Sequence, residues 1–67
     1  MNQLKRNAIL KAIRVLKQRH KGNRKYAVHP QDVVSELTRA RCSYYWADMY
    51  DGVKCTRKEV EEVMKGE

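Results

Sequence analysis

Apolar residues recur at every third or fourth position through the first twenty residues of the chain. This spacing gathers side chains on one side of an α-helix. The apolar side consists of Leu4, Ala8, Ile9, Ala12, Ile13, Val15 and Leu16, and Leu10 alone falls outside it. The opposite side holds Arg6, Asn7, Lys11, Arg14, Lys17 and Gln18 and no carboxylate. The pattern predicts a helix over residues 1–20 with one buried side and one side suited to negative charge.

A polar break follows this helix at residues 21–25, where Gly22 suits the C′ position beyond a helix end. The next residues, Tyr26 to Val28, approach Pro30, and a residue that precedes proline is pushed out of helical geometry. We therefore expect a short extended piece here, which could form a strand.

A second helix is expected after this extended piece. Pro30 suits the first turn of a helix, and Asp32 suits the positive end of the helix dipole. Apolar residues then repeat at helical spacing at Val33, Val34, Leu37 and Ala40. The predicted helix runs from Gln31 to Arg39 or Ala40.

The aromatic middle of the chain has two interpretations. Its apolar residues step by three and four at Cys42, Tyr45, Trp46, Met49, Tyr50 and Val53, which favours a helix from an N-cap at Ser43 to Tyr50. Asp51 and Gly52 would end that helix. The alternative is a hairpin with residues 44–49 and 53–55 as its arms, because Asp-Gly is also a hairpin turn signal. In either case we expect Trp46 and one or two tyrosines in the core, and Tyr44 exposed.

The last helix begins with the capping-box sequence Thr56-Arg57-Lys58-Glu59. Val60, Val63 and Met64 give it a narrow apolar side, and Lys65-Gly66 ends it. The predicted fold is therefore a single all-α domain over residues 1–67, with three or four helices and at most one short strand or hairpin. A 67-residue chain buries a small core, so a homodimer is a further expectation.

Positive charge is concentrated in the first half. The net charge is +7, of which residues 1–30 carry +9 and residues 31–67 carry −2. Clustered cations gain free energy by releasing the counterions of a polyanion, so this asymmetry favours nucleic acid as the partner. The candidate contact residues are Arg6, Lys11, Arg14, Lys17, Arg19, Lys21, Arg24, Lys25, Arg39, Arg41, Tyr44, Arg57 and Lys58. A membrane surface and an acidic protein are the alternatives, the latter with the aromatic residues as its anchor.

Other chemistry has weak support. His20, His29, Cys42 and Cys55 lack the closely spaced pairs of a structural zinc site, and a disulfide between the two cysteines would need an oxidising compartment. No paired acid and base, nucleophile motif or glycine-rich phosphate loop is present, so we expect no enzyme, cofactor or metal. No apolar run is long enough for a membrane span or a signal peptide, which favours a cytoplasmic protein.

The order of these elements resembles the helix-turn-helix superfamily, and its winged-helix branch in particular. The resemblance is carried by the long amphipathic helix, the short extended piece, the second helix opening HPQDVVSEL and the capped helix TRKEVEEVM. It implies a compact DNA-binding domain in which one helix reads the major groove. The chain departs from the family in its long connection before Thr56 and in lacking a wing hairpin after the last helix.

Two segments could serve as the recognition helix that this resemblance implies. In the segment from Ser43 to Tyr50, the residues facing the bases would be Tyr44, Tyr45 and Asp48. In the segment from Thr56 to Lys65 they would be Arg57 and Lys58, near a helix N-terminus that favours phosphate. The acidic Glu59, Glu61 and Glu62 count against the second segment.

The predicted function is duplex DNA binding through the basic first half, as a small regulatory or accessory protein of a bacterium, plasmid or virus. RNA binding is an alternative, because no sequence signature separates the two.

Overall fold

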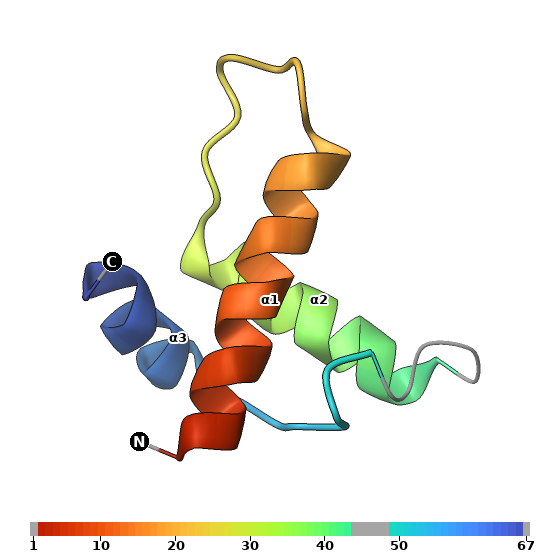
Figure 1. Cartoon of the computed structure of the whole chain (residues 1–67), viewed down its shortest axis with the longest axis vertical. Helices are drawn as coiled ribbons and strands as arrows, with labels where there is room; N and C mark the ends of the chain where they lie inside the picture. The colour runs from red at the N-terminus through yellow and green to blue at the C-terminus, as the bar shows by residue number, and fades with distance from the viewer. Residues whose placement is uncertain (1, 44–48, 67) are drawn as a thin grey trace.

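Three helices make up the secondary structure of a computed structural model that describes residues 2–43 and 49–66. They are α1 (Gln3–Arg19), α2 (Pro30–Cys42) and α3 (Arg57–Lys65) (Figure 1). No strand occurs in the described residues, so the all-α class is confirmed and a strand at Tyr26 to Val28 is wrong. The second helix begins with Pro30 and continues two residues beyond its predicted end, to Cys42.

The predicted amphipathic pattern of α1 is largely confirmed. The side chain of Asn2 caps the helix by accepting a hydrogen bond from the Leu4 amide at 2.8 Å. The buried residues are Ala8, Ile9, Ala12, Ile13 and Leu16. Leu4 was expected on the buried side but is 46% exposed, so that part of the prediction is wrong. Leu10 and Val15 are half-buried at the edges of the core.

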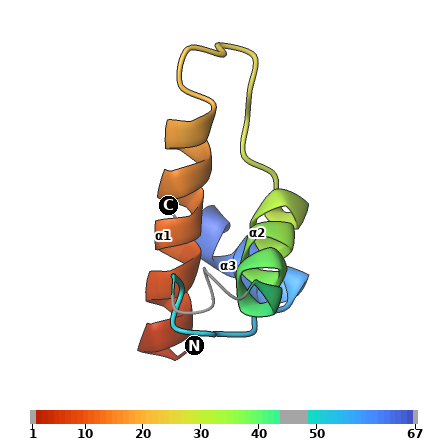
Figure 2. The same cartoon turned by 90° about the vertical axis from the view of Figure 1, so that its right-hand side faces the viewer.

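The helices form two layers. α1 lies in front, and α2 crosses behind it with α3 beside it (Figures 1 and 2). Each helix contacts the other two, and the molecule measures 30 × 28 × 15 Å. One side of α1 is thus covered by both other helices, and its opposite side is left open along the helix.

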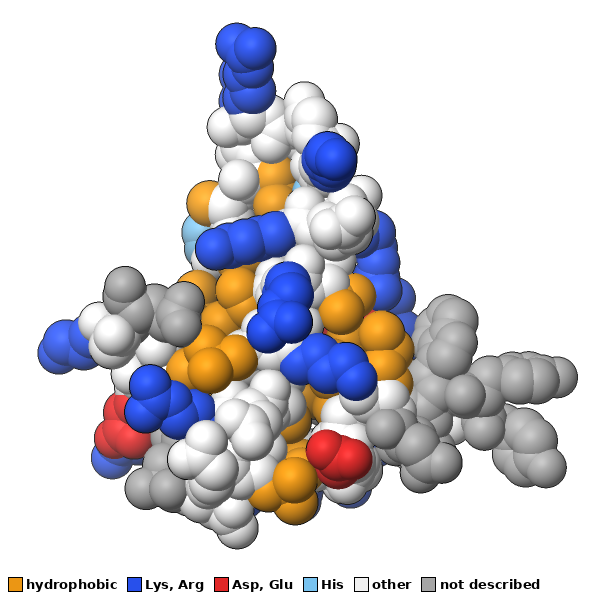
Figure 3. Space-filling view, viewed as in Figure 1, with side chains coloured by type: hydrophobic (Ala, Val, Ile, Leu, Met, Phe, Trp, Pro, Cys, Tyr) orange, Lys and Arg blue, Asp and Glu red, His pale blue; other side chains and the backbone are white. Residues whose placement is uncertain are grey.

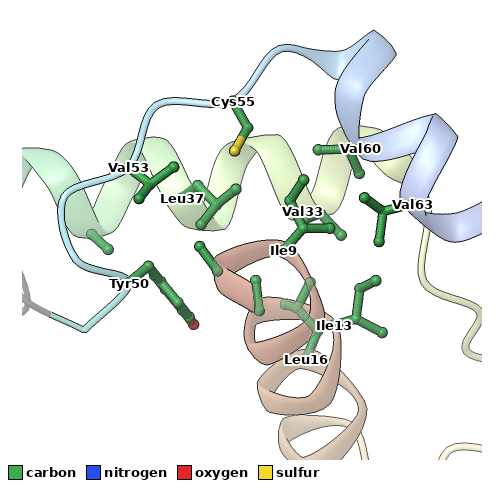
Figure 4. Close-up of a cluster of buried hydrophobic side chains, with 13 residues drawn as sticks. Ile9, Ile13, Leu16, Val33, Leu37, Tyr50, Val53, Cys55, Val60 and Val63 are labelled. Carbon is green, nitrogen blue, oxygen red and sulfur yellow. The ribbon is translucent and has the colours of Figure 1, made fainter. Parts of the chain in front are cut away.

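The core lies where the three helices meet (Figure 4). Its larger side chains are Ile9, Ile13 and Leu16 from α1, Val33 and Leu37 from α2, and Val60 and Val63 from α3. The connection between α2 and α3 adds Tyr50, Val53 and Cys55, which are 2%, 9% and 8% exposed. The end of this connection is therefore part of the core, and Tyr50 confirms the expectation that a tyrosine fills it.

The aromatic connection differs from the favoured interpretation. Met49 to Gly52 form a turn in which Asp51 and Gly52 have φ of 57° and 64°, and the Val53 amide donates to the Tyr50 carbonyl at 3.2 Å. A helix that ends at Tyr50 is therefore wrong at its C-terminal end, and a fourth helix is not found in the described residues. Its middle, with Tyr44, Tyr45, Trp46 and Asp48, lies outside them. The Asp-Gly turn of the hairpin alternative is present, but residues 53–55 form no strand.

The capping box of α3 is confirmed. The Thr56 hydroxyl accepts from the Glu59 amide at 3.3 Å, and the Glu59 carboxylate accepts from the Thr56 amide at 3.0 Å. The same carboxylate pairs with Lys5 of α1 at 3.0 Å. The cap of α3 is thereby tied to the first turn of α1.

We expect Thr56→Ala to lower the free energy of unfolding by about 1 kcal/mol, because the Glu59 amide loses its acceptor. In a domain of this size that corresponds to a fall in melting temperature of about 4–8 °C, measurable by circular dichroism. Thr38→Ala is the control, because Thr38 is exposed and makes no cap. An equal loss in both variants would contradict a specific role for the cap.

Candidate nucleic-acid interface

The open side of α1 carries a row of exposed cations. Lys11, Arg14 and Lys17 follow one another at intervals of three residues, which places them along one side of the helix. Lys and Arg side chains gather along α1 and at the end of the loop beyond it, with apolar patches between them (Figure 3). None of the three forms an ion pair with any residue in the described ranges. Their charge is therefore available to an external anion.

The loop after α1 extends this row. Lys21, Arg24 and Lys25 are exposed, and Figure 1 shows the loop projecting beyond the end of the helix. We call these three residues and Lys11, Arg14 and Lys17 the α1 cationic face. Gly22 has φ of 97°, a conformation in which a side chain would be strained.

Local contacts fix the shape of this loop. The rings of His20 and Tyr26 stack at 3.8 Å and close its base. The Asn23 side-chain oxygen accepts from the Lys25 backbone amide at 3.1 Å, and the backbone amide of Asn23 donates to the His20 carbonyl at 3.0 Å. The loop is therefore preorganised, which lowers the entropy lost when its cations are immobilised by a partner.

Two of the predicted contact residues are engaged in ion pairs within the described part of the chain. Arg57 pairs with Glu61 at 3.1 Å on the exposed surface of α3. Arg19 pairs with Glu36 of α2, also at 3.1 Å. Since both of these cations have internal partners, neither belongs to the α1 cationic face.

Glu36 is the centre of a buried polar network. Its two carboxylate oxygens accept from both terminal nitrogens of Arg19 at 3.1 Å, and the Tyr50 hydroxyl donates to it at 3.1 Å. The network joins the end of α1, the middle of α2 and the connection before α3. Sequence reasoning missed it, although Glu36 falls on the apolar side of α2 between Val33 and Leu37, where a carboxylate needs a partner.

The contacts set the charge states of this network. Hydrogen bonds from the Arg19 guanidinium lower the pKa of Glu36 below its ordinary value, and the Tyr50 hydroxyl adds to the effect while burial opposes it. Burial and the adjacent carboxylate raise the pKa of Tyr50 to about 12. At neutral pH Glu36 is thus a carboxylate that accepts a hydrogen bond from a neutral phenol.

The remaining predicted contact residues are spread over the molecule. Arg6 shares a surface hollow with Glu62, so its charge is partly offset. Arg39 and Arg41 are exposed in the last turn of α2, and Lys58 is exposed in the first turn of α3. Tyr44 lies outside the described residues. The structure therefore brings together the cations of α1 and its loop, but not those of α3.

Other candidate chemistry has little to build on. Within residues 2–43 and 49–66, no three His, Cys, Asp or Glu side chains cluster in a way that could hold a metal ion. Cys42 is exposed, Cys55 is buried, and both are free thiols. Burial raises the pKa of the Cys55 thiol, which makes it a poor nucleophile. No described helix has the length and apolar character to cross a bilayer.

The chain matches no protein-family model, no curated protein sequence and no solved structure.

Proposed function

We propose that the chain binds duplex DNA by laying its α1 cationic face along the phosphate backbone. The observation that carries this proposal is the set of six exposed cations on α1 and its loop that have no carboxylate partner among the described residues. A surface that serves only solubility would mix both signs of charge. A polyanion neutralises this surface and gains free energy from the counterions it releases.

The dimensions of the face suit a backbone. At a rise of 1.5 Å per residue, Lys11 and Lys17 are separated by about 9 Å along α1, which matches two to three base-pair steps at about 3.4 Å each. The loop carries the charge further in the same direction (Figure 1). One strand can thus contact both parts of the face.

The resemblance to the helix-turn-helix superfamily also predicts that α3 reads base edges in the major groove, and this stays a prediction. Two features make α3 a weak reader. Arg57 near its N-terminus is already paired with Glu61, and Glu62 is exposed on the same helix. Residues 43–56 also separate α2 from α3, where the family has a short turn. The proposed contacts are therefore mainly to phosphate, with α1 as the principal element.

Affinity for a short DNA duplex should fall steeply with salt. If about five phosphates are neutralised, the logarithm of affinity against the logarithm of salt concentration has a slope near −4 to −5. Fluorescence anisotropy with a labelled duplex at several salt concentrations measures this slope. A slope near zero would remove the DNA assignment.

Competition identifies the polymer. We expect unlabelled duplex DNA to displace the labelled duplex at lower concentration than single-stranded DNA or structured RNA of equal length. Preferential displacement by structured RNA would assign the face to RNA instead. Retention of an acidic protein partner after nuclease treatment and in high salt would favour the protein-interaction alternative.

A further inference from the structure

A second polar feature is a cleft of about 400 Å³ between the end of α1, the base of the loop at His20 and Tyr26, and α2. Arg19 lines it from α1, and Asp32, Ser35, Glu36 and Arg39 line it from α2. Counted from Asp32, the other three α2 residues follow at three, four and seven positions, so all four share one side of that helix. The buried network of Glu36 thus forms part of the cleft wall.

Arg19 is held in this cleft with part of its donor capacity unused. A guanidinium has five N–H donors, and the two hydrogen bonds to Glu36 use two of them. The side chain of Arg19 is 45% exposed, whereas that of Glu36 is 7% exposed. The remaining N–H donors of Arg19 are therefore on a guanidinium whose position is fixed by the buried Glu36.

The ion pair has a geometric consequence beyond stability. An ion pair between a half-exposed arginine and a buried carboxylate adds little net stability, because solvent screens one partner and the other loses its hydration. It does restrict a long side chain to one orientation. A guanidinium fixed in this way loses less entropy on binding an oxyanion than a free surface arginine does.

Arg39 supplies a second cation at the same place. It lies three residues after Glu36, close to one helical turn, and its charge contributes to lowering the pKa of that carboxylate. Ser35, which also lines the cleft, adds a hydroxyl four residues before Arg39. In the described part of the chain Arg39 forms no ion pair, and its side chain is exposed.

The acidic groups of the cleft lie away from Arg39 or have a partner. Glu36 neutralises Arg19, so the net positive charge at this end of the cleft is that of Arg39. Asp32 is seven residues before Arg39, about 10 Å along α2, and its carboxylate accepts from the His29 amide at the start of the helix. The cleft is thus acidic at its Asp32 end and basic at its Arg39 end.

We propose that the Arg39 end of this cleft binds one phosphate oxyanion between Arg19 and Arg39, with Glu36 as a positioning residue that holds Arg19. The inference rests on the proposed function, because the phosphate is assigned to the backbone of the DNA that occupies the α1 cationic face. The cleft would then hold one phosphate in a fixed geometry, whereas the exposed cations of the α1 cationic face contact phosphates without a fixed geometry.

The first test compares Arg39→Gln with Arg41→Gln. Both arginines are exposed in the last turn of α2, but only Arg39 lines the cleft. We expect Arg39→Gln to weaken duplex binding about eightfold in 0.1 M salt and to reduce the magnitude of the salt slope by about 0.9, as one lost phosphate contact requires. Arg41→Gln should weaken binding less than about threefold. Equal losses would overturn the cleft site.

The second test uses Glu36→Gln, for which general electrostatics and the positioning role of Glu36 predict opposite changes in DNA affinity. Glu36→Gln raises the net charge from +7 to +8, so general electrostatics predicts tighter DNA binding. Release of Arg19 predicts weaker binding, and we expect a loss of about threefold or more. Tyr50→Phe is the matched control, because it removes one hydrogen bond to Glu36 but leaves its charge opposite Arg19. Tighter binding by Glu36→Gln would overturn the positioning role.

Circular dichroism checks that each variant is folded at the temperature of the binding measurement. If Glu36→Gln is unfolded, the comparison of Arg39→Gln with Arg41→Gln tests the cleft site by itself. A wild-type chain that fails to bind DNA contradicts the proposed function, whereas normal wild-type binding with equal arginine variants contradicts only the cleft. Calorimetric titration with inorganic phosphate separates the two sources of the oxyanion. The wild type could bind free phosphate, and Arg39→Gln could lose that binding while its DNA affinity is unchanged. This result would contradict the assignment of the bound phosphate to the DNA backbone.

Discussion

Reversing two charges on α1, in the variant Arg14→Glu/Lys17→Glu, is expected to weaken duplex DNA binding at least 100-fold in 0.1 M salt. Each lost phosphate contact removes a factor of about eight at this salt concentration, and two contacts remove about sixtyfold. Repulsion between the new carboxylates and the backbone adds to the loss. The slope of log affinity against log salt should become shallower by about 1.8 at the same time. Anisotropy titrations over a range of salt measure both quantities.

The control is Lys54→Glu/Lys65→Glu, which changes the net charge from +7 to +3 as the test variant does. Lys54 and Lys65 are exposed outside α1, and Lys65 lies in the last turn of its helix as Lys17 does. Both variants therefore place one carboxylate at an unfavourable helix end, which costs about 0.3–1 kcal/mol of stability. Equal weakening by the control would mean that DNA senses only the total charge and that α1 is not the binding surface.

The elements that local rules govern were predictable. Thr56 and Glu59 specify the start of α3 by reciprocal hydrogen bonds that involve four consecutive residues only. The period of apolar residues likewise specified α1 and its buried side. In both cases neighbouring positions along the chain determine the structure, so no knowledge of the tertiary arrangement is needed.

The aromatic connection was not predictable in the same way. Its apolar spacing fits a helix, yet Met49 to Gly52 form a turn with positive φ at Asp51 and Gly52. The turn places Tyr50 in the core, where its hydroxyl reaches Glu36 fourteen positions earlier in the sequence. Periodicity alone carries no information about contacts between distant residues such as this one.

The candidate interface shows the same division. The exposed cations Lys11, Arg14 and Lys17 could be read from the helical wheel, because a helix turns its polar side outward. The wheel could not show that Arg19 points to a buried carboxylate on α2, since that pairing depends on how two helices cross. Arg19 therefore changes from one of many surface cations to the link between the surface and the core.

Truncation of Glu36 should lower the free energy of unfolding more than any of the other substitutions proposed for this chain. We expect Glu36→Ala to lower the free energy of unfolding by about 2–3 kcal/mol, because the buried Tyr50 hydroxyl is left without an acceptor and a charged hydrogen-bond network is lost. Arg19 is half-exposed and can return to water, which keeps the loss below that of a fully buried pair. Chains of this length have about 3–10 kcal/mol in total. Urea unfolding followed by circular dichroism measures the change.

The stability of the wild type should also depend on pH through Glu36. Its pKa is lower in the folded chain than the ordinary 4.5, because Arg19 and then Tyr50 donate hydrogen bonds to the ionised form. The unfolded chain therefore binds the proton more tightly than the folded one. The stabilisation is fully present above the unfolded pKa and is lost as the pH falls through the lower, folded pKa. Unfolding free energies measured from neutral pH down to acid should decline in this window.

The difference between wild type and Glu36→Gln isolates the contribution of Glu36, because the other carboxylates are common to both chains. The pKa of Glu59 is also lowered, mainly by its hydrogen bond from the Thr56 backbone, and this contribution is common to both chains. Glu61→Gln is the matched control, because Glu61 is exposed in its pair with Arg57 and should change stability by less than about 0.5 kcal/mol at any pH. The gap between wild type and Glu36→Gln should close as the pH falls, because a protonated Glu36 is as neutral as the glutamine. A gap that stays constant down to acid pH would show that Glu36 acts through its size and shape, and not through its charge opposite Arg19.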